Sequence, residues 1–222
     1  EIADVVARAN ANRPAAEHAL LCVDGVHGFG VDDVTVGDLG CDFFVAGCHK
    51  WMLGPRGTGI IWGKTERWPL LRPTIPHFGS EGFSAWLKDQ PPPPTNANMM
   101  TPGGFHSFEH RWALREAFVF HQEVGKTKIM ARIHDLNRKC KDGLAMMRHV
   151  TLHTPRAAEL SAGITTFEVA GVEPAAAVKR LYEHRVIATQ TPYRESYVRV
   201  APGLYNSEED VEEVLRAVRA LA

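Results

Sequence analysis

The hydrophobic pattern changes period several times along the chain. Residues 2–11 carry apolar side chains at helical spacing, whereas 18–25, 41–47 and 60–63 are short, continuous apolar runs. Such runs, bounded by turn residues and joined by connections too long for hairpins, predict buried strands of a mostly parallel sheet. A short helical turn over 35–40 fits one of these connections. We therefore expect the first part of the chain to be an α/β domain whose sheet is covered on both faces.

A proline-rich stretch and then a long helical stretch follow. Residues 65–108 include four consecutive prolines at 91–94, which exclude a helix and a central strand there. We expect this stretch to be a loop between domains, and loops of such length are usually functional or mobile. Residues 109–147 keep helical spacing, and Gly125 indicates a bend in this interdomain helix.

The last part of the chain, 148–222, alternates between the two patterns again. Its expected elements are strands over 163–171, 186–190 and 197–202 and helices over 174–185 and 207–222. Ser207 and Asp210 have the spacing of a capping box at the start of the last helix. The chain is therefore expected to end in a small α/β domain, which follows a first domain over 1–64.

Composition and charge exclude several classes of function. The formal net charge of −1 gives no electrostatic basis for binding nucleic acid or an anionic membrane, and no apolar run is long enough to span a bilayer. The 11 histidines are scattered without a metal-ligand spacing, so we expect no metal site. The cysteines form no CxxC pair, which predicts reduced, buried thiols in a cytoplasmic protein; they are Cys22, Cys41, Cys48 and Cys140.

The candidate chemistry lies where the first two expected strands end. Asp24 closes the first apolar run, and His49 and Lys50 follow the second. Ligands of open α/β sheets bind beyond the carboxyl ends of the strands, so these side chains are expected to meet in one crevice. His27 follows Asp24 by three residues and is expected to point into the same crevice. A salt bridge between Asp24 and Lys50 is the simpler interpretation of the same pattern.

This set of side chains suits pyridoxal phosphate (PLP). The aldehyde of the cofactor needs an amine to form a Schiff base, and a lysine desolvated near cations is a usable nucleophile and proton carrier, which makes Lys50 the candidate. The ring nitrogen must stay protonated, which needs a buried carboxylate such as Asp24. His27 is placed to donate to the ring oxygen, and His49 is a candidate donor to the phosphate.

Residues 23–63, which include GCHKWMLGPRGTG, resemble the cofactor-binding signature of class V aminotransferases, a family of fold-type I PLP enzymes. The GCHKW form is most similar to the isopenicillin N epimerase-like branch, near the cysteine desulfurases. The resemblance implies that Lys50 forms the Schiff base and that Asp24 contacts the pyridine nitrogen. It also implies that His27 lies at the 3-hydroxyl side of the ring and that His49 contacts the phosphate.

The resemblance extends to the C-terminal part of the chain. Residues 197–215 are similar to a family segment in which an arginine binds the substrate carboxylate, and that arginine matches Arg199. A guanidinium binds a carboxylate through two parallel hydrogen bonds, so the residue type fits this role. An exposed charge on a strand is the alternative interpretation of Arg199.

The fold implied by the resemblance is a fold-type I α/β architecture in two domains. Residues 1–64 would be the C-terminal part of the large cofactor-binding domain, with a mostly parallel sheet, and 148–222 the small C-terminal domain. Between them lie the interdomain loop over 65–108 and the interdomain helix over 109–147. Family members act as homodimers, so a homodimer is expected. The chain begins without Met and inside a helical pattern, from which we expect a fragment that lacks the phosphate-binding helix and the ring-stacking residue of its relatives.

Two positions depart from the family pattern. Gly47 stands where cysteine desulfurases carry a phosphate-binding serine. The stretch SFEHRWAL stands where relatives carry a Gly-Thr pair, through which the partner subunit touches the phosphate, so His110 or Arg111 is expected to replace that pair.

The expected function is PLP chemistry on an amino acid, through transaldimination at Lys50 and loss of the α-proton to the same lysine. Epimerisation, transamination or C–S cleavage can follow, and the sequence leaves this choice and the substrate open. The alternative is a catalytically incompetent fragment or remnant that acts in dimerisation or partner binding.

Overall fold

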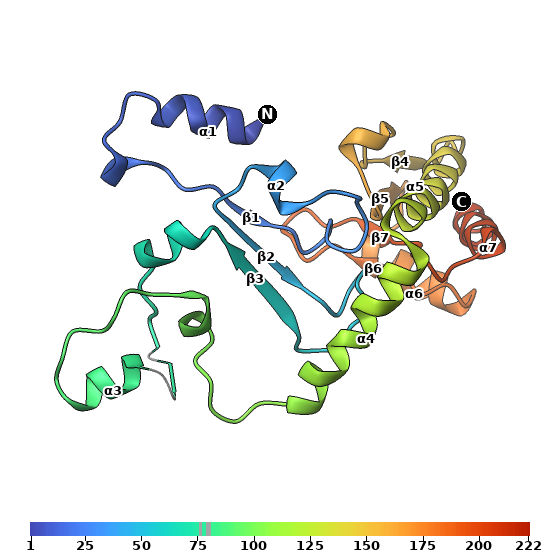
Figure 1. Ribbon diagram of the computed structural model, residues 1–222. Coiled ribbons are helices and arrows are strands. Elements are labelled where there is room, and N and C mark those ends of the chain that lie inside the picture. Colours follow the sequence, from blue (N-terminus) through green and yellow to red (C-terminus); the bar gives the residue numbers. More distant parts are fainter. Residues whose placement is uncertain (76, 79–80) are drawn as a thin grey trace. The chain divides into compact units, whose positions relative to one another are not determined.

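The computed structural model describes residues 1–75, 77–78 and 81–222 (Figure 1). The interdomain loop expected over 65–108 includes positions 76, 79 and 80, which lie outside the described residues. No helix in the described ranges is long and apolar enough to cross a membrane.

Contacts between residues divide the chain into two compact units. The first comprises residues 1–29 and 34–120, and the second comprises 30–33 and 121–222. The first unit contains a three-stranded sheet and the second a four-stranded sheet.

The sheet of the first unit consists of β1 (Cys22–Asp24), β2 (Phe43–Gly47) and β3 (Gly59–Gly63), in that order. The parallel pairing that the sequence predicted is found between β1 and β2, whereas β3 runs antiparallel to β2. A parallel neighbour needs a crossover, usually a helix, but β2 and β3 are joined by the short turn 48–58. The chain therefore reverses direction at this turn.

Three helical segments precede or connect these strands: α1 (Ile2–Asn10), the 3-10 turn η1 (Ala15–Glu17) and α2 (Val36–Leu39). α2 begins at a capping box, in which Thr35 and Asp38 each bond the backbone N–H of the other. Its two apolar residues pack against a buried cluster on and just before β2, formed by Cys41, Phe44 and Ala46.

The structure corrects the expectation that β1 is buried on both faces. β1 lies at the edge of the sheet, and the side chains of Cys22 and Asp24 are exposed while Val23 between them is partly buried. Successive side chains of a strand point to opposite faces, so Cys22 and Asp24 share the uncovered face. All four cysteines are free thiols, and Cys22 alone among them is exposed.

The stretch after β3 contains short helices rather than an irregular loop throughout. These are η2 (Thr65–Leu70), α3 (Glu81–Leu87) and η3 (Ala97–Met100). The sequence signal for them was weak because each is shorter than three turns, and the prolines at 91–94 lie between α3 and η3 in a segment without regular secondary structure. Thr95 anchors that segment by donating its hydroxyl to Leu71 O (2.6 Å).

The long helical stretch is divided into α4 (Phe108–Val124) and α5 (Lys126–Ala145). The division falls at Gly125, where the sequence indicated a bend, and Gly125 has a φ of 92°. Glycine adopts this backbone conformation without the steric penalty of a Cβ atom, which explains why the helix stops there.

The second unit is an antiparallel sheet with helices packed against it. Its strands are β4 (Val150–Leu152), β5 (Thr165–Val169), β6 (Thr189–Gln190) and β7 (Val198–Val200), in the order β4-β5-β7-β6, and its further helices are η4 (Ala158–Leu160), α6 (Pro174–Glu183) and α7 (Glu208–Arg219). The core lies between the sheet and these helices, and Phe167, Leu144 and Leu181 are fully buried in it.

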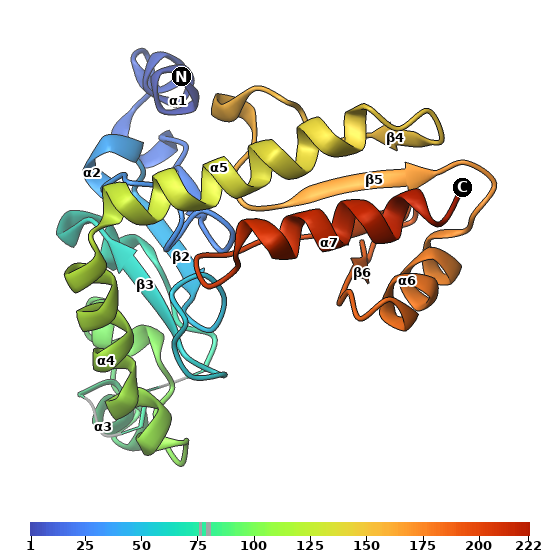
Figure 2. The same cartoon turned by 90° about the vertical axis from the view of Figure 1, so that its right-hand side faces the viewer.

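Figure 2 shows α5 and α7 side by side. A Cβ atom on Gly143 of α5 would lie 2.3 Å from Leu215 of α7, so glycine permits this close approach.

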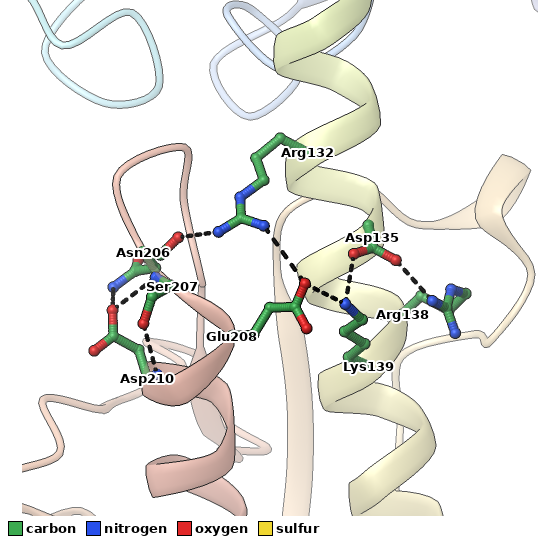
Figure 3. A network of polar contacts seen from close by, with 8 residues as sticks. All are labelled: Arg132, Asp135, Arg138, Lys139, Asn206, Ser207, Glu208 and Asp210. Atoms are coloured by element: carbon green, nitrogen blue, oxygen red, sulfur yellow. Dashed lines mark hydrogen bonds and ion pairs between the residues drawn. The ribbon is translucent and has the colours of Figure 1, made fainter.

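Polar contacts join the start of α7 to α5 (Figure 3). Arg132 donates to Asn206 O (2.8 Å), and the Glu208 carboxylate lies 2.7 Å from Lys139 Nζ. The capping box that the sequence predicted is present, because the Ser207 hydroxyl accepts the N–H of Asp210 and the Asp210 carboxylate accepts the N–H of Ser207. The ion pairs among these contacts lie near the surface, so each contributes little, and the apolar packing beneath them carries most of the stability.

A buried lysine holds a loop of the second unit in place. Lys141 of α5 is 3% exposed, and its ammonium donates to the carbonyls of Pro155 and Arg156 (both 3.1 Å) and to Ser161 Oγ (2.5 Å). Burial lowers the pKa of Lys141, and three hydrogen bonds offset the cost of its desolvation.

Candidate active site

Asp24 is the last residue of β1, and the neighbouring strand fixes its position. It pairs with Val45 of β2, and the next residue, Gly25, donates its N–H to Val45 O (2.8 Å). A Cβ atom on Gly25 would lie 2.1 Å from the ring of Phe44, so glycine is required for this packing. The Asp24 carboxylate accepts the N–H of Val26 (3.1 Å), which orients it at the start of the turn.

Lys50 lies in the turn after β2, at the same edge of the sheet as Asp24 because the two strands are parallel. Four backbone hydrogen bonds shape the turn. They join Cys48 N–H to Thr58 O (2.9 Å), Gly54 N–H to Cys48 O (2.8 Å), Leu53 N–H to Lys50 O (3.0 Å) and Thr58 N–H to Pro55 O (3.3 Å). Leu53 has a φ of 58°, a left-handed conformation that costs a non-glycine residue about 1–2 kcal/mol. The surrounding contacts must therefore hold the turn in this shape.

The side chains of Lys50 and His27 meet beyond the ends of the two strands. Lys50 Nζ lies 3.4 Å from His27 Nε2, within hydrogen-bond distance. His27 is held in a turn in which Gly25 O accepts the N–H groups of Gly28 (3.0 Å) and Phe29 (2.8 Å). The structure thus brings together a lysine and a histidine that are 23 positions apart in the sequence.

An open groove of about 510 Å³ runs past these strand ends. Six of the residues that line it are Asp24 at the end of β1 and Val26 after it, Gly47 and Gly59 at the paired ends of β2 and β3, and Ala97 and Thr101 at the start of η3 and just after its end. The two paired glycines leave the groove without side chains where the strands end, which makes room for a ligand beside Asp24.

His49 and Trp51 flank Lys50 in the sequence. His49 lies next to a space that Gly47 leaves unfilled, and Trp51 has a buried N–H group without an acceptor among the described residues. A Cβ atom on Gly47 would lie 3.1 Å from His49 Cε1 and 3.7 Å from Val26, so glycine keeps the space between these side chains free. Trp51 Nε1 is buried and has no hydrogen-bond acceptor among the described residues. Buried donors are normally paired, so this group is suited to an acceptor atom of a ligand.

The structure corrects the expectation that Asp24 and Lys50 are buried. Both are exposed, as are His27 and His49. Asp24 stands on the uncovered face of an edge strand, and Lys50 projects from a turn beyond the sheet. The simpler interpretation, a salt bridge between Asp24 and Lys50, is not found either, because these two residues form no ion pair in the described part of the chain. Asp24 instead accepts the N–H of Val26, and Lys50 contacts His27.

The remaining predicted site residues lie on α4 and on β7. Arg111 is exposed in the first turn of α4. His110, its neighbour, contacts the turn after Lys50, because its Nδ1 lies 2.9 Å from Arg56 O. That contact spans 54 positions, and no pattern in the sequence indicated it. Arg199 lies on β7 of the second unit, is partly buried, and donates its Nε–H to Thr189 Oγ1 (2.9 Å).

Cys48, next to His49, is not arranged as a nucleophile. Its side chain is fully buried, and burial raises the pKa of the thiol. The thiolate is the reactive form, so a buried thiol with a raised pKa is chemically inert at neutral pH. Cys48 is therefore a packing residue behind the lysine turn. In the described ranges, no group of three or more His, Cys, Asp or Glu side chains is placed to hold a metal ion.

Comparison with known proteins identifies the family. The model of the family described as aminotransferase class-V matches residues 4–214. Isopenicillin N epimerase of Streptomyces clavuligerus is 29% identical over 211 residues, which cover 90% of this chain and 52% of that protein. A probable cysteine desulfurase of Halalkalibacterium halodurans is 29% identical over 163 residues, which cover 70% of this chain and 37% of the relative.

Solved structures show the same fold. The apo structure of a cysteine desulfurase from Thermococcus onnurineus matches with a TM-score of 0.77 at 22% identity, over 93% of this chain and 53% of that one. A C-DES mutant whose PLP cofactor carries covalently linked glycine matches with a TM-score of 0.82 at 20% identity, over 98% of this chain and 55% of that one. These likenesses confirm the fold-type I α/β architecture. The chain spans about half the length of the proteins that it matches over most of its residues.

Proposed function

The chain belongs to the aminotransferase class-V family, and on this premise we propose that it provides the lysine-bearing part of a PLP-dependent enzyme that acts on an amino acid. The observation that carries the proposal is the contact between Lys50 Nζ and His27 Nε2 at 3.4 Å, beside Asp24 at the ends of two parallel strands. This edge of an α/β sheet is where ligands of such folds bind.

The residues present fit the cofactor. Lys50 is the amine that would hold it covalently, and Asp24 offers a carboxylate for its ring nitrogen across a groove that Gly47 and Gly59 keep open. His27 is a polar partner next to the lysine, and His49 borders the space beside Gly47 that would take the phosphate. When bound, PLP acts as an electron sink that acidifies the α-proton of an amino acid.

The side chains of this chain then have distinct tasks. Lys50 accepts and returns a proton at the α-carbon, and His27 orients the Lys50 amine through their contact. Arg199 binds the substrate carboxylate, with its guanidinium oriented by the bond from Nε to Thr189. Arg111 would contact the phosphate of the cofactor in place of the Gly-Thr pair of relatives. Epimerisation, transamination and C–S cleavage all follow from the same proton transfer, and the names of the relatives support epimerisation and C–S cleavage.

The proposal includes an assignment of the chain to domains. Residues 1–64 belong to the large cofactor-binding domain, 65–108 to the interdomain loop, 109–147 to the interdomain helix and 148–222 to the small domain. The complete protein is a homodimer, and the four free thiols favour a reducing, cytoplasmic location.

The exposure of Asp24 and Lys50 favours a second candidate function. A carboxylate and an amine that face water are poorly tuned for this chemistry, so the chain by itself would be a catalytically incompetent fragment that acts in dimerisation or partner binding. The two candidates differ in whether PLP becomes attached at Lys50.

The test is an absorption spectrum after addition of PLP, followed by borohydride reduction and peptide mapping. We expect a visible band and a PLP label on Lys50 that is absent from Lys50→Ala. Lys88→Ala, which removes an exposed lysine that does not line the groove, is the matched control and should keep both signals. Labelling spread over surface lysines, with no preference for Lys50, would reject the enzymatic proposal for this chain and favour the incompetent fragment.

A further inference from the structure

We propose that one face of α4, formed by His110, Leu114 and Phe118, is a positioning surface for the two turns that carry Lys50 and His27. The proposal rests on the function proposed above, because it concerns how the two residues of that site are held. The three residues follow one another at intervals of four, so they lie on the same side of the helix. Each contacts a different point of the two turns, and all belong to the first unit.

His110 holds the far side of the lysine turn. Its Nδ1 lies 2.9 Å from Arg56 O. A carbonyl oxygen only accepts hydrogen bonds, so His110 Nδ1 carries the proton and donates it. Arg56 lies between Pro55 and Thr58, whose backbone and side-chain bonds close the end of the same turn. The histidine therefore fixes a backbone carbonyl six residues after Lys50.

Leu114 holds the middle of the lysine turn. A Cβ atom on Gly54 would lie 2.8 Å from Leu114 Cδ1 and 2.8 Å from Cys48 O, so the leucine covers Gly54 where the turn closes. Leu53, the residue before, is in the left-handed conformation. A turn that contains a strained residue keeps its shape when packing opposes relaxation, and Leu114 supplies that packing.

Phe118 holds the turn that carries His27. Its ring lies 6.1 Å from the ring of Phe29, which also packs edge-on against Phe44 of β2 at 5.9 Å. The N–H of Phe29 bonds Gly25 O, and this bond closes the turn around His27. One helix face thus touches both turns whose side chains meet at 3.4 Å, and it sets the distance between them.

The test measures the turn and the site separately. Hydrogen exchange of amides in residues 48–58 is followed in the chain without PLP, and PLP fixation at Lys50 is followed by borohydride reduction and mapping. We expect His110→Ala to speed exchange of the turn amides about fivefold, the size that one intramolecular hydrogen bond gives, and to lower fixation at Lys50 by a similar factor. His110→Asn can place an amide donor near the position of Nδ1 and should restore both.

Matched variants keep the test decisive. Arg115→Ala lies on the same helix but pairs with Glu116 rather than with either turn, so it should change neither reading. Leu114→Ala should raise exchange in the same amides, and Phe118→Ala should raise it in residues 25–29 instead. Exchange that is unchanged in His110→Ala, or that His110→Asn fails to restore, would overturn the positioning role.

The two proposals fail in different ways. If the wild-type chain never fixes PLP at Lys50, the proposed function is rejected, and the exchange readings still decide whether α4 holds the turns. If Lys50 is labelled equally in the wild type and in His110→Ala while exchange changes, the helix holds the turn but does not position the lysine, and the inference is rejected.

Discussion

His27 Nε2 lies 3.4 Å from Lys50 Nζ although the two residues come from turns after different strands. The parallel pairing of β1 and β2 sends both turns to the same edge of the sheet, and the register that pairs Asp24 with Val45 places the strand ends together. The contact is therefore a consequence of strand direction, which is itself a consequence of the crossover that contains α2.

We predict that His27→Ala lowers PLP fixation at Lys50 about fivefold, because the lysine loses the partner that orients its amine. His27→Gln keeps a polar group in reach and should lose less. The measurement is the labelled fraction of Lys50 after borohydride reduction. His18→Ala removes a histidine of the same unit that contacts Arg13 O instead, and an equal loss in that control would mean that the effect is not specific to the site.

Gly25→Ala should destabilise the first unit, because the new Cβ atom would lie 2.1 Å from the ring of Phe44. Overpacking of this kind costs about 1–3 kcal/mol, read from the midpoint of thermal or denaturant unfolding. Gly37→Ala in α2 is the matched control, because its Cβ atom would lie 3.5 Å from Thr35 Oγ1, an ordinary contact. Equal stability of the two variants would show that Phe44 moves aside at little cost.

Asp42 gives the first unit a pH-dependent contribution to stability. Burial acts to raise the pKa of Asp42, but the N–H of Leu21 and the cations of Lys64 and Arg67 outweigh it and hold the pKa below its usual range. A carboxyl whose pKa is depressed on folding stabilises the folded state above its unfolded pKa, and this stability is lost as the pH falls through the lower, folded value.

Asp42→Asn should therefore lower the free energy of unfolding by about 1.5–3 kcal/mol at pH 7, the range for hydrogen bonds to a charged group. The difference between wild type and variant should shrink as the pH falls below about 4, the ordinary pKa of an aspartate. Unfolding measured from pH 7 to pH 3 checks this, and a difference that is constant across the range would assign the effect to packing rather than charge.

The hydrophobic pattern predicted most of the fold because long periodic segments determine their own secondary structure. Strands β2 and β3, the bend at Gly125 and the capping box of Ser207 and Asp210 all followed from local sequence. The direction of β3 and the exposed face of β1 did not follow from local sequence. Both depend on the order in which the strands pair in the sheet. A continuous apolar run predicts a strand, but it does not determine which strand or layer lies beside it.

For the site, the sequence indicated the residue types and the strand ends, and it indicated only some of the contacts between segments. That Lys50 meets His27 was foreseeable from parallel strands, whereas the bond from His110 to Arg56 O joins residues with no common pattern. Burial was overestimated for Asp24 and Lys50 because apolar residues that precede a position in the sequence do not cover it in space.

Arg199→Ala should weaken the binding of amino acids to the PLP-loaded protein about 10- to 100-fold, the size expected when charge-assisted hydrogen bonds to a carboxylate are lost. Fixation of PLP at Lys50 should not change, because the role proposed for Arg199 is to bind the carboxylate of the amino acid and not the cofactor. The measurement is a spectral titration of the bound cofactor with an amino acid. A matched amine without the carboxylate is the control ligand, and it should bind wild type and variant alike.

Thr189→Val, which removes the oxygen that orients the guanidinium of Arg199, should give a smaller loss of amino acid affinity. If the variant loses affinity equally for the amine and the amino acid, Arg199 does not read the carboxylate.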